Sequence, residues 1–232
     1  MTRADFFVTG TDTGVGKTLI AAALLSALKD AGLRTVGMKP VAAGLVERSG
    51  RLVSEDVAML LEASKVKAPR ELVNPYTLRE PVAPNLAAAM EGVRIEAETI
   101  VDAFHSLQLY GDAVIVEGAG GFRVPLGDVF DGADLARMLG IPVVMVVGMR
   151  LGCVNHALLT GEAIVARGLE IAGWVANCVD PQMALVEDNV AMLRVRLGAP
   201  CLGVVPHLAA LDFVVAARSL NVQPLLDREA RG

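Results

Sequence analysis

Cysteine and histidine are scarce in this chain, and neither is arranged for metal binding. Cys153, Cys178 and Cys201 lie more than twenty residues apart, form no C-x-x-C pair, and are accompanied by only 3 histidines. Zinc sites need closely spaced pairs of these ligands, so the usual zinc spacings are excluded. We expect reduced thiols in the core. The alternative, a nucleophilic Cys153 paired with His156, lacks a nearby third group to orient the histidine.

An excess of basic residues is also missing. The 232 residues include 21 Lys and Arg against 26 Asp and Glu, which gives a formal net charge of −5, and there is no basic run. Nucleic acids and anionic lipid surfaces are bound mainly through clustered positive charge. The sequence therefore argues against non-specific nucleic-acid binding and against a membrane-surface partner.

Long hydrophobic runs are absent, although apolar residues make up 53% of the chain. The apolar runs, such as residues 19–25 and 141–149, are far shorter than the roughly 18–20 residues of a membrane-spanning helix. The N-terminal residues pass directly into a strand-like segment without an apolar signal region. We therefore expect a soluble cytoplasmic protein whose apolar residues form buried strands and helices.

Short apolar segments alternate with segments of helical periodicity. Strands are predicted at residues 6–9, 35–38, 113–116, 143–147, 171–176 and 202–205. Their near-continuous Val, Ile and Ala content is typical of strands buried on both faces of a parallel sheet. Helices are predicted at 17–31 and 154–167, each followed by a glycine suited to a left-handed C-cap. These patterns and the length predict one α/β domain over residues 1–232, with a doubly wound, mainly parallel sheet.

Prolines are concentrated in residues 68–92, at positions 69, 75, 81 and 84. We expect this region to form a long ordered loop. In a doubly wound sheet, ligands bind outside the carboxyl ends of the strands, and the unusual residues of this chain follow the predicted strands.

Residues 10–18 read G-T-D-T-G-V-G-K-T and connect the first strand to the first helix. They depart from the phosphate-loop pattern G-x-x-x-x-G-K-[ST] only at the first glycine, where Thr11 stands. Gly14 and Gly16 allow successive backbone N–H groups to face an anion, and Lys17 adds positive charge beside the helix N-terminus. The hydroxyl of Thr18 is a candidate ligand for Mg²⁺. The segment predicts a nucleotide-phosphate site on a P-loop NTPase-like fold.

Three charged residues occur at or near the ends of other predicted elements. Glu117 follows the strand at 113–116 and precedes a glycine-rich segment, a position typical of a Walker-B acid. Asp56 lies near the start of a helical segment, where it is a second Mg²⁺ candidate or, alternatively, a helix-capping residue. Lys39 follows the strand at 35–38, where it is either a second phosphate clamp or a surface charge.

Seven short blocks between residues 10 and 177 are distinctive when taken together. They are G-T-D-T-G-V-G-K-T at 10–18, M-K-P-V-A-A-G at 38–44, N-P-Y-T at 74–77, E-P-V-A-P at 80–84, V-E-G-A-G-G at 116–121, V-V-G-M-R-L-G-C-V-N-H-A at 146–157 and G-W-V-A-N at 173–177. In this order they resemble the dethiobiotin synthetase family. The resemblance implies an ATP- and Mg²⁺-dependent ligase of biotin biosynthesis. Such an enzyme joins CO₂ to 7,8-diaminononanoate through a carbamate and a carbamic-phosphoric anhydride, and then closes a cyclic urea.

The resemblance also implies roles for individual residues. Lys17 and Lys39 would be catalytic, and Thr18, Asp56 and Glu117 would hold Mg²⁺. The implied ATP-binding residues are Thr13, Gly14, Val15, Gly16, Lys17, Thr18, Leu19, Asp56, Glu117, Gly118, Ala119, Gly120, Asn177, Cys178, Pro206, His207 and Leu208. The implied substrate-binding residues are Lys39, Ala43, Gly44, Leu151, Gly152, Cys153 and Asn155. In the family, the last four open a helix that binds the substrate carboxylate across a homodimer interface, and Asn155 is also expected to cap that helix.

The chain departs from the family pattern at two positions near the reacting amines. Gly14 stands where members often have Glu, and Ala43 where they often have Ser or Thr. Both departures remove polar side chains that would face the substrate.

Two other functional classes share this kind of fold and loop. Regulatory or partitioning P-loop ATPases have a lysine five positions before the catalytic one, where this chain has Asp12. Glutamine-dependent amidases need an additional domain with a Cys nucleophile, for which 232 residues leave no room, so of this class only a stand-alone subunit stays open. The diamine ligase is therefore the predicted function, and the regulatory ATPase is the alternative.

Overall fold

A six-stranded parallel sheet forms the centre of the computed structural model, which describes residues 3–228. The strand order is β10-β9-β8-β1-β7-β2. The strands are β1 (Phe6–Gly10), β2 (Thr35–Met38), β7 (Ala113–Glu117), β8 (Val143–Gly148), β9 (Ile171–Asn177) and β10 (Cys201–Val205). All six predicted strands are confirmed. Because β1, β7 and β8 are buried along their whole length, they are rich in apolar residues and show no polar alternation.

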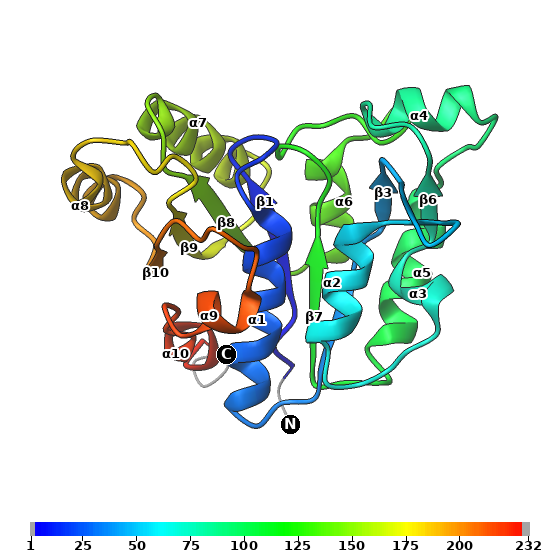
Figure 1. Ribbon diagram of the computed structural model, residues 1–232, viewed down its shortest axis with the longest axis horizontal. Helices are drawn as coiled ribbons and strands as arrows, with labels where there is room; N and C mark the ends of the chain where they lie inside the picture. The colour runs from blue at the N-terminus through cyan, green and yellow to red at the C-terminus, as the bar shows by residue number, and fades with distance from the viewer. Residues whose placement is uncertain (1–2, 229–232) are drawn as a thin grey trace.

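Helices cover both faces of this sheet, as Figure 1 shows. On one face, α1 (Lys17–Asp30) packs against α2 (Glu55–Ala63) and α9 (Phe213–Ala217), with α10 (Gln223–Leu226) in the same apolar cluster. The other face is covered by α5 (Ala97–Leu107), α6 (Gly132–Leu139), α7 (Cys153–Ala166) and α8 (Val186–Arg196). The doubly wound α/β prediction is confirmed.

The two helices predicted from periodicity are confirmed to within one residue at each end. α1 and α7 are each followed by a glycine in the left-handed region, Gly32 at φ +101° and Gly168 at φ +72°. Glycine adopts this conformation without steric cost, which lets the chain turn back toward the next strand.

The prediction that residues 68–92 form a long loop is wrong. The region contains α3 (Arg70–Val73), β6 (Tyr76–Leu78) and α4 (Pro84–Met90), and β6 pairs in parallel with β3 (Val41–Ala43). Its prolines lie at element boundaries: Pro69 caps α3, and Pro84 is in the first turn of α4, where a missing N–H costs nothing. The prolines therefore separate short elements instead of preventing them.

A second small sheet is an antiparallel hairpin of β4 (Val46–Arg48) and β5 (Arg51–Val53), which is largely exposed. Among the described residues, no helix combines the length and the apolar character needed to cross a membrane.

Candidate active site

The phosphate loop follows β1 directly and ends where α1 begins. Gly14 and Gly16 have φ of +73° and +84°, and Gly16 is the N-cap of α1. A Cβ atom on Gly16 would lie 2.2 Å from Nδ2 of Asn177, which itself donates a hydrogen bond of 2.9 Å to the Val15 carbonyl. Both the backbone angle and the close neighbour require glycine at this position. The loop is thus held open to an anion on one side and packed against the end of β9 on the other.

A cavity of about 660 Å³ lies at the ends of β1, β2 and β7. This size falls within the range of small-molecule sites. The predicted site residues that line it are Thr13, Gly14, Gly16, Lys17, Thr18, Leu19, Lys39, Ala43, Asp56, Glu117, Ala119 and Gly120. The structure therefore brings the phosphate loop and the candidate catalytic and metal-binding residues together around one cavity.

Lys39 forms the centre of a charged cluster on the wall of this cavity. Its Nζ lies 2.7 Å from Oδ2 of Asp56 and 2.7 Å from Oε1 of Glu117. The Thr18 hydroxyl oxygen lies 2.9 Å from Oδ1 of Asp56 and 2.7 Å from Oε1 of Glu117. Lys39 is only 4% exposed and Glu117 only 1%, so the alternative that Lys39 is a surface charge is wrong.

The environment shifts the pKa of both lysines, in opposite directions. Burial alone would lower the pKa of Lys39, but the carboxylates of Glu117 and Asp56 outweigh it and raise that pKa above its ordinary value. Burial and the nearby charge of Lys39 lower the pKa of Lys17 to about 8. Lys39 is therefore held in its charged form, whereas the lowered pKa brings Lys17 closer to neutrality than Lys39.

The two acids also differ. Burial raises the pKa of Glu117 despite the opposing charge of Lys39. Burial acts in the same sense on Asp56, but Lys39 and the Thr18 hydroxyl overcome it and lower the Asp56 pKa. Asp56 is consequently the more strongly ionised of the two carboxyl groups.

The oxygen groups in this cluster fit a magnesium ion. Oε2 of Glu117 is buried and has no hydrogen-bond partner among the described residues, so one carboxylate oxygen is left to be satisfied. Mg²⁺ is held in proteins by one or two carboxylates, with phosphate oxygens and waters completing the octahedron. Residues 3–228 contain no group of three or more His, Cys, Asp and Glu suited to a metal. Thr18, Asp56 and Glu117 could supply the protein oxygens.

Several predicted nucleotide residues lie outside the cavity, behind the phosphate loop. Asn177 is buried at the end of β9 and contacts the loop through Val15. The Cys178 carbonyl oxygen lies 3.3 Å from Nδ1 of His207, and this contact joins the segment after β10 to the end of β9. Gly118 donates its N–H to the Val8 carbonyl at 3.0 Å and borders a separate small hollow next to Glu117.

The predicted substrate residues on α7 are also outside the cavity. Leu151 is 97% exposed, and Asn155 is exposed in the first turn of the helix. The expectation that Asn155 caps α7 is wrong, because the N-cap is Gly152 in the left-handed conformation, at φ +92°. Gly44 is likewise not among the lining residues, and its N–H is bonded to the Leu78 carbonyl at 3.1 Å.

The cysteines are free thiols, as expected. Cys153 is 2% exposed and packs in the core, whereas His156 is exposed on the helix surface. No hydrogen bond joins these two side chains within the described part of the chain, so the nucleophile alternative has no geometric support.

The cavity also includes residues that the sequence did not single out. They are Val41, Glu55, Met59, Pro81, Val82, Ala83, Pro84, Val124 and Leu211. Residues 81–84 belong to a block on which the family resemblance depended, and Glu55 is the neighbour of Asp56, so sequence signals existed for these. Leu211 had none, because it comes from a distant segment that only the tertiary fold brings to the cavity.

The fold and the site together define a P-loop nucleotide-binding protein. The structure is similar to the septum site-determining protein MinD complexed with Mg-ADP from Pyrococcus horikoshii, with a TM-score of 0.59 and 16% identity over all of both chains. It is also similar to a ParA family ATPase from Chlorobium tepidum, with a TM-score of 0.55 and 16% identity over all of this chain and 93% of that one. At these identities the similarity establishes the fold alone.

Sequence comparison narrows this class to one family. A family model described as an AAA domain matches residues 4–214. The ATP-dependent dethiobiotin synthetase BioD of Aromatoleum aromaticum is 55% identical over 217 residues, which cover 94% of this chain and 96% of that protein. The protein of the same description from Ralstonia nicotianae is 53% identical over 226 residues, which cover 97% and 99% of the two chains. The chain belongs to the dethiobiotin synthetase family, as the sequence blocks predicted.

Proposed function

We propose that the cavity between the phosphate loop, Lys39 and α2 is where this chain carries out the ATP-dependent synthesis of dethiobiotin that characterises its family. CO₂ and 7,8-diaminononanoate are the other substrates, and ADP and phosphate the other products. The observation that carries this assignment is the convergence of Lys17, Thr18, Lys39, Asp56 and Glu117 on one cavity. In a chain that is 53–55% identical to relatives of that activity, these residues supply the charge that the reaction requires.

The reaction needs positioning and positive charge more than a protein nucleophile. One substrate amine adds to CO₂ and loses a proton, which gives a carbamate. A carbamate oxygen then attacks the γ-phosphorus of ATP and ADP leaves, so that a carbamic-phosphoric anhydride forms. The second amine attacks the carbamoyl carbon and loses a proton, phosphate departs and the urea ring closes. Each nucleophile comes from the substrates, and the protein's task is to hold them in line and stabilise the transferring charge.

The two lysines stabilise different negatively charged groups. Backbone N–H groups of the phosphate loop and Nζ of Lys17 bind the phosphates at the N-terminus of α1. Lys39 faces the same cavity from the end of β2 and stabilises the carbamate and the transferring phosphoryl group. Since its pKa is raised, Lys39 acts as a fixed positive charge and does not accept a proton from the substrate amine.

Thr18, Asp56 and Glu117 are the residues that we assign to Mg²⁺. When bound there with the nucleotide, the ion would neutralise charge on the β- and γ-phosphate oxygens. The buried, unpartnered Oε2 of Glu117 supports this assignment, because such an oxygen is costly unless a ligand satisfies it.

The adenine-binding role of Asn177, Cys178 and residues 206–208 is part of the same proposal. Asn177 uses one amide hydrogen on the Val15 carbonyl, and its remaining amide groups are available to a base beside the loop. His207 and Cys178 are in contact at the ends of β10 and β9, which gives these residues one common location.

We further propose a homodimer, in which Leu151, Gly152, Cys153 and Asn155 serve the cavity of the second subunit. Leu151 is almost fully exposed, and these residues do not line the cavity of their own chain. Their position suits the substrate carboxylate, since they lie at the N-terminus of α7, where the positive end of the helix dipole favours an anion. Sedimentation analysis tests the dimer, and mixing an inactive Lys39 variant with an inactive Leu151 variant would restore part of the activity if the sites are shared.

Labelled bicarbonate provides the direct test of function. With Mg-ATP and 7,8-diaminononanoate, the purified protein is expected to release ADP and to place the labelled carbon in dethiobiotin. Replacing Lys39→Met keeps the length of the side chain but removes its charge, and turnover should fall by roughly 10²–10³-fold. Absence of labelled product at saturating substrates would overturn the proposal, and full activity of the Lys39→Met protein would overturn the role of Lys39.

A further inference from the structure

Asn74 is a buried amide that the reaction does not use directly. It lies between α3 and β6, is 5% exposed, and is not among the residues that line the cavity. Its Nδ2 donates two hydrogen bonds, one of 2.6 Å to the carbonyl of Lys39 and one of 2.9 Å to the carbonyl of Tyr76. A single side chain therefore joins the backbone of the central lysine to the small β3–β6 sheet.

The neighbouring backbone strengthens this connection. The N–H of Lys39 donates to the Val73 carbonyl at 2.8 Å, and the N–H of Tyr76 donates to the Pro40 carbonyl at 3.1 Å. After Pro40 the chain forms β3, which pairs in parallel with β6, the strand that begins at Tyr76. Both backbone groups of Lys39 are thus bonded to the segment that Asn74 orients, while its Nζ reaches the acids.

The two carbonyls fix which way the Asn74 amide faces, because a carbonyl oxygen can only accept and therefore requires the NH₂ group. The Thr77 hydroxyl then donates to Oδ1 of Asn74. Both amide hydrogens and the amide oxygen have partners, and a rotated amide would place its oxygen against the two carbonyls and lose both of those bonds.

We propose that Asn74, held by a hydrogen bond from Thr77, is a positioning residue that sets the place of Lys39 in the reaction. The inference rests on the proposed role of Lys39. Nζ of Lys39 lies 2.7 Å from each of two carboxylates, and a displacement of its backbone would move it relative to both the acids and the γ-phosphate. A misplacement of about 1 Å is enough to cost roughly 10²-fold in rate. ATP binding, which depends on the phosphate loop, would be affected much less.

Asn74→Asp is the sharpest test, because it keeps the shape of the side chain but replaces the two donors with an oxygen that faces two carbonyl oxygens. We expect kcat to fall by about tenfold or more. The dissociation constant for ATP, measured by calorimetry, should change by less than about threefold, since no contact with the phosphate loop is lost.

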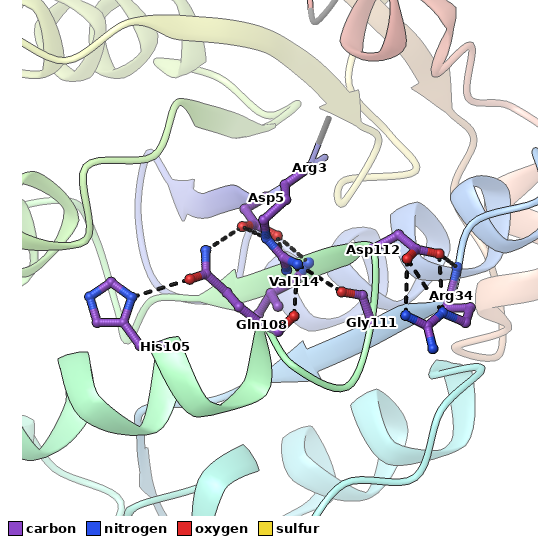
Figure 2. Close-up of polar contacts among 8 residues, drawn as sticks. All are labelled: Arg3, Asp5, Arg34, His105, Gln108, Gly111, Asp112 and Val114. Carbon is purple, nitrogen blue, oxygen red and sulfur yellow. Dashed lines mark hydrogen bonds and ion pairs between the residues drawn. The ribbon is translucent and has the colours of Figure 1, made fainter. Parts of the chain in front are cut away.

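Gln108→Glu is the matched control at the opposite end of the sheet. Nε2 of Gln108 donates to Oδ2 of Asp5 at 2.7 Å (Figure 2), and neither residue lines the cavity. Like Asn74→Asp, the Gln108→Glu substitution converts a donating amide into a carboxylate that faces an acceptor. This variant should lose thermal stability comparably and keep kcat within about twofold of the wild type, as substitutions away from the reacting groups do.

Thr77→Val supplies a second variant, which removes only the hydroxyl that donates to Oδ1 of Asn74. We expect Thr77→Val to lose less kcat than Asn74→Asp, and Thr77→Ser to keep the wild-type value. These two results, together with the loss in Asn74→Asp, would support the proposal. Unchanged kcat in Asn74→Asp and Thr77→Val would overturn it, as would an equal loss of kcat in Gln108→Glu. If the wild type is active and Lys39→Met is not, these outcomes concern Asn74 alone and leave the proposed function standing.

Discussion

Each end of the central sheet carries a buried acid, but the two acids are satisfied very differently. At the amino end, Asp5 is 6% exposed and accepts four hydrogen bonds (Figure 2). Two of these come from Arg3, at 2.9 and 3.1 Å, one from Nε2 of Gln108 and one from the N–H of Val114, both at 2.7 Å. At the carboxyl end, both contacts of Glu117 fall on Oε1, and Oε2 has no partner among the described residues.

The difference separates a structural acid from a functional one. The four bonds of Asp5 tie the start of β1 to β7 and to the end of α5, and they leave no capacity for a ligand. Glu117 and Lys39 instead form a buried ion pair at the edge of a cavity, and Oε2 of Glu117 has no hydrogen-bond partner among the described residues. Buried polar groups in proteins are normally paired, so an unpaired one in a cavity indicates a ligand site.

The largest expected difference between the two ends of the sheet is in the effect of a glycine substitution on ATP affinity. Gly16 and Gly140 both adopt positive φ, of +84° and +64°, but a Cβ atom would meet Asn177 at 2.2 Å in the first case and nothing within 4 Å in the second. Gly16→Ala should therefore abolish measurable ATP binding, a loss of more than about 100-fold in affinity, because the anion-binding loop cannot keep its shape.

Gly140→Ala is the control for that substitution. It should cost about 1–2 kcal/mol of stability for the left-handed conformation and leave ATP affinity unchanged. Calorimetric titration and thermal unfolding distinguish the two variants. Wild-type affinity in Gly16→Ala would mean that the loop adjusts without loss, and the contrast between the two ends would fail.

The two acids themselves give the next contrast. Asp5→Asn removes the charge that pairs with Arg3 and places an NH₂ group among donors, so it should destabilise the fold by about 2–4 kcal/mol with kcat within about twofold. Glu117→Gln should lower turnover by roughly 10²-fold and raise the Mg²⁺ requirement, with a smaller change in stability, because burial already opposes its charged form. Urea denaturation and steady-state kinetics measure both quantities. The reverse pattern, a stable Asp5→Asn protein of low activity, would contradict the division of roles.

The carboxyl end of the sheet was the more predictable of the two from sequence. Lys39 and Glu117 come directly after continuous apolar segments, and parallel strands bring their carboxyl ends to one edge, so a shared cavity could be inferred without coordinates. The sequence could not show that Lys39 lies between Asp56 and Glu117, because this depends on how α2 packs beside β2. Nor could it show the β3–β6 pair, since strands of three residues carry too little periodicity and are stabilised by tertiary contacts.

Two expectations about single asparagines depended on backbone conformation and tertiary contacts that the sequence does not show. Asn155 is a good N-cap residue by type, but the chain reaches the left-handed region three residues earlier, and Gly152 takes the cap. Asn177 was expected to face the nucleotide, and its position against Gly16 and Val15 depends on the contact between β9 and the phosphate loop, which are far apart in sequence. The role of Asn177 in binding adenine stays a prediction.

ATP binding at the carboxyl end should also depend on pH. The pKa of Lys17 is lowered to about 8, and bound phosphates would raise it by favouring the charged form. Below pH 8, Lys17 is protonated with and without ATP, so affinity is insensitive to pH. Above pH 8, binding must take up a proton, and affinity should fall by up to about tenfold per pH unit until the pKa of the complex is reached.

Calorimetry in buffers of different ionisation enthalpy measures that proton uptake directly. Lys17→Arg is the control, because a guanidinium stays charged throughout this range and its variant should bind ATP without proton uptake between pH 8 and 10. Identical uptake in the Lys17→Arg protein would assign the titration to another group.

The smallest effect is expected from the exposed ion pair at the amino end. Nη2 of Arg34 lies 3.1 Å from Oδ1 of Asp112, and the two side chains are 55% and 26% exposed. Hydrogen bonds from Arg34 hold the pKa of Asp112 below its ordinary value, so the stabilisation is fully present above the unfolded-state pKa and is lost as the pH falls through the lower pKa of the folded protein. Arg34→Ala should cost less than about 1 kcal/mol near neutral pH, and this difference should shrink at high salt and in acid.

Urea denaturation at several pH values and salt concentrations tests this, and turnover should not change. A loss of turnover in Arg34→Ala would show that the amino end influences the cavity, and the separation between a structural and a functional end of the sheet would no longer hold.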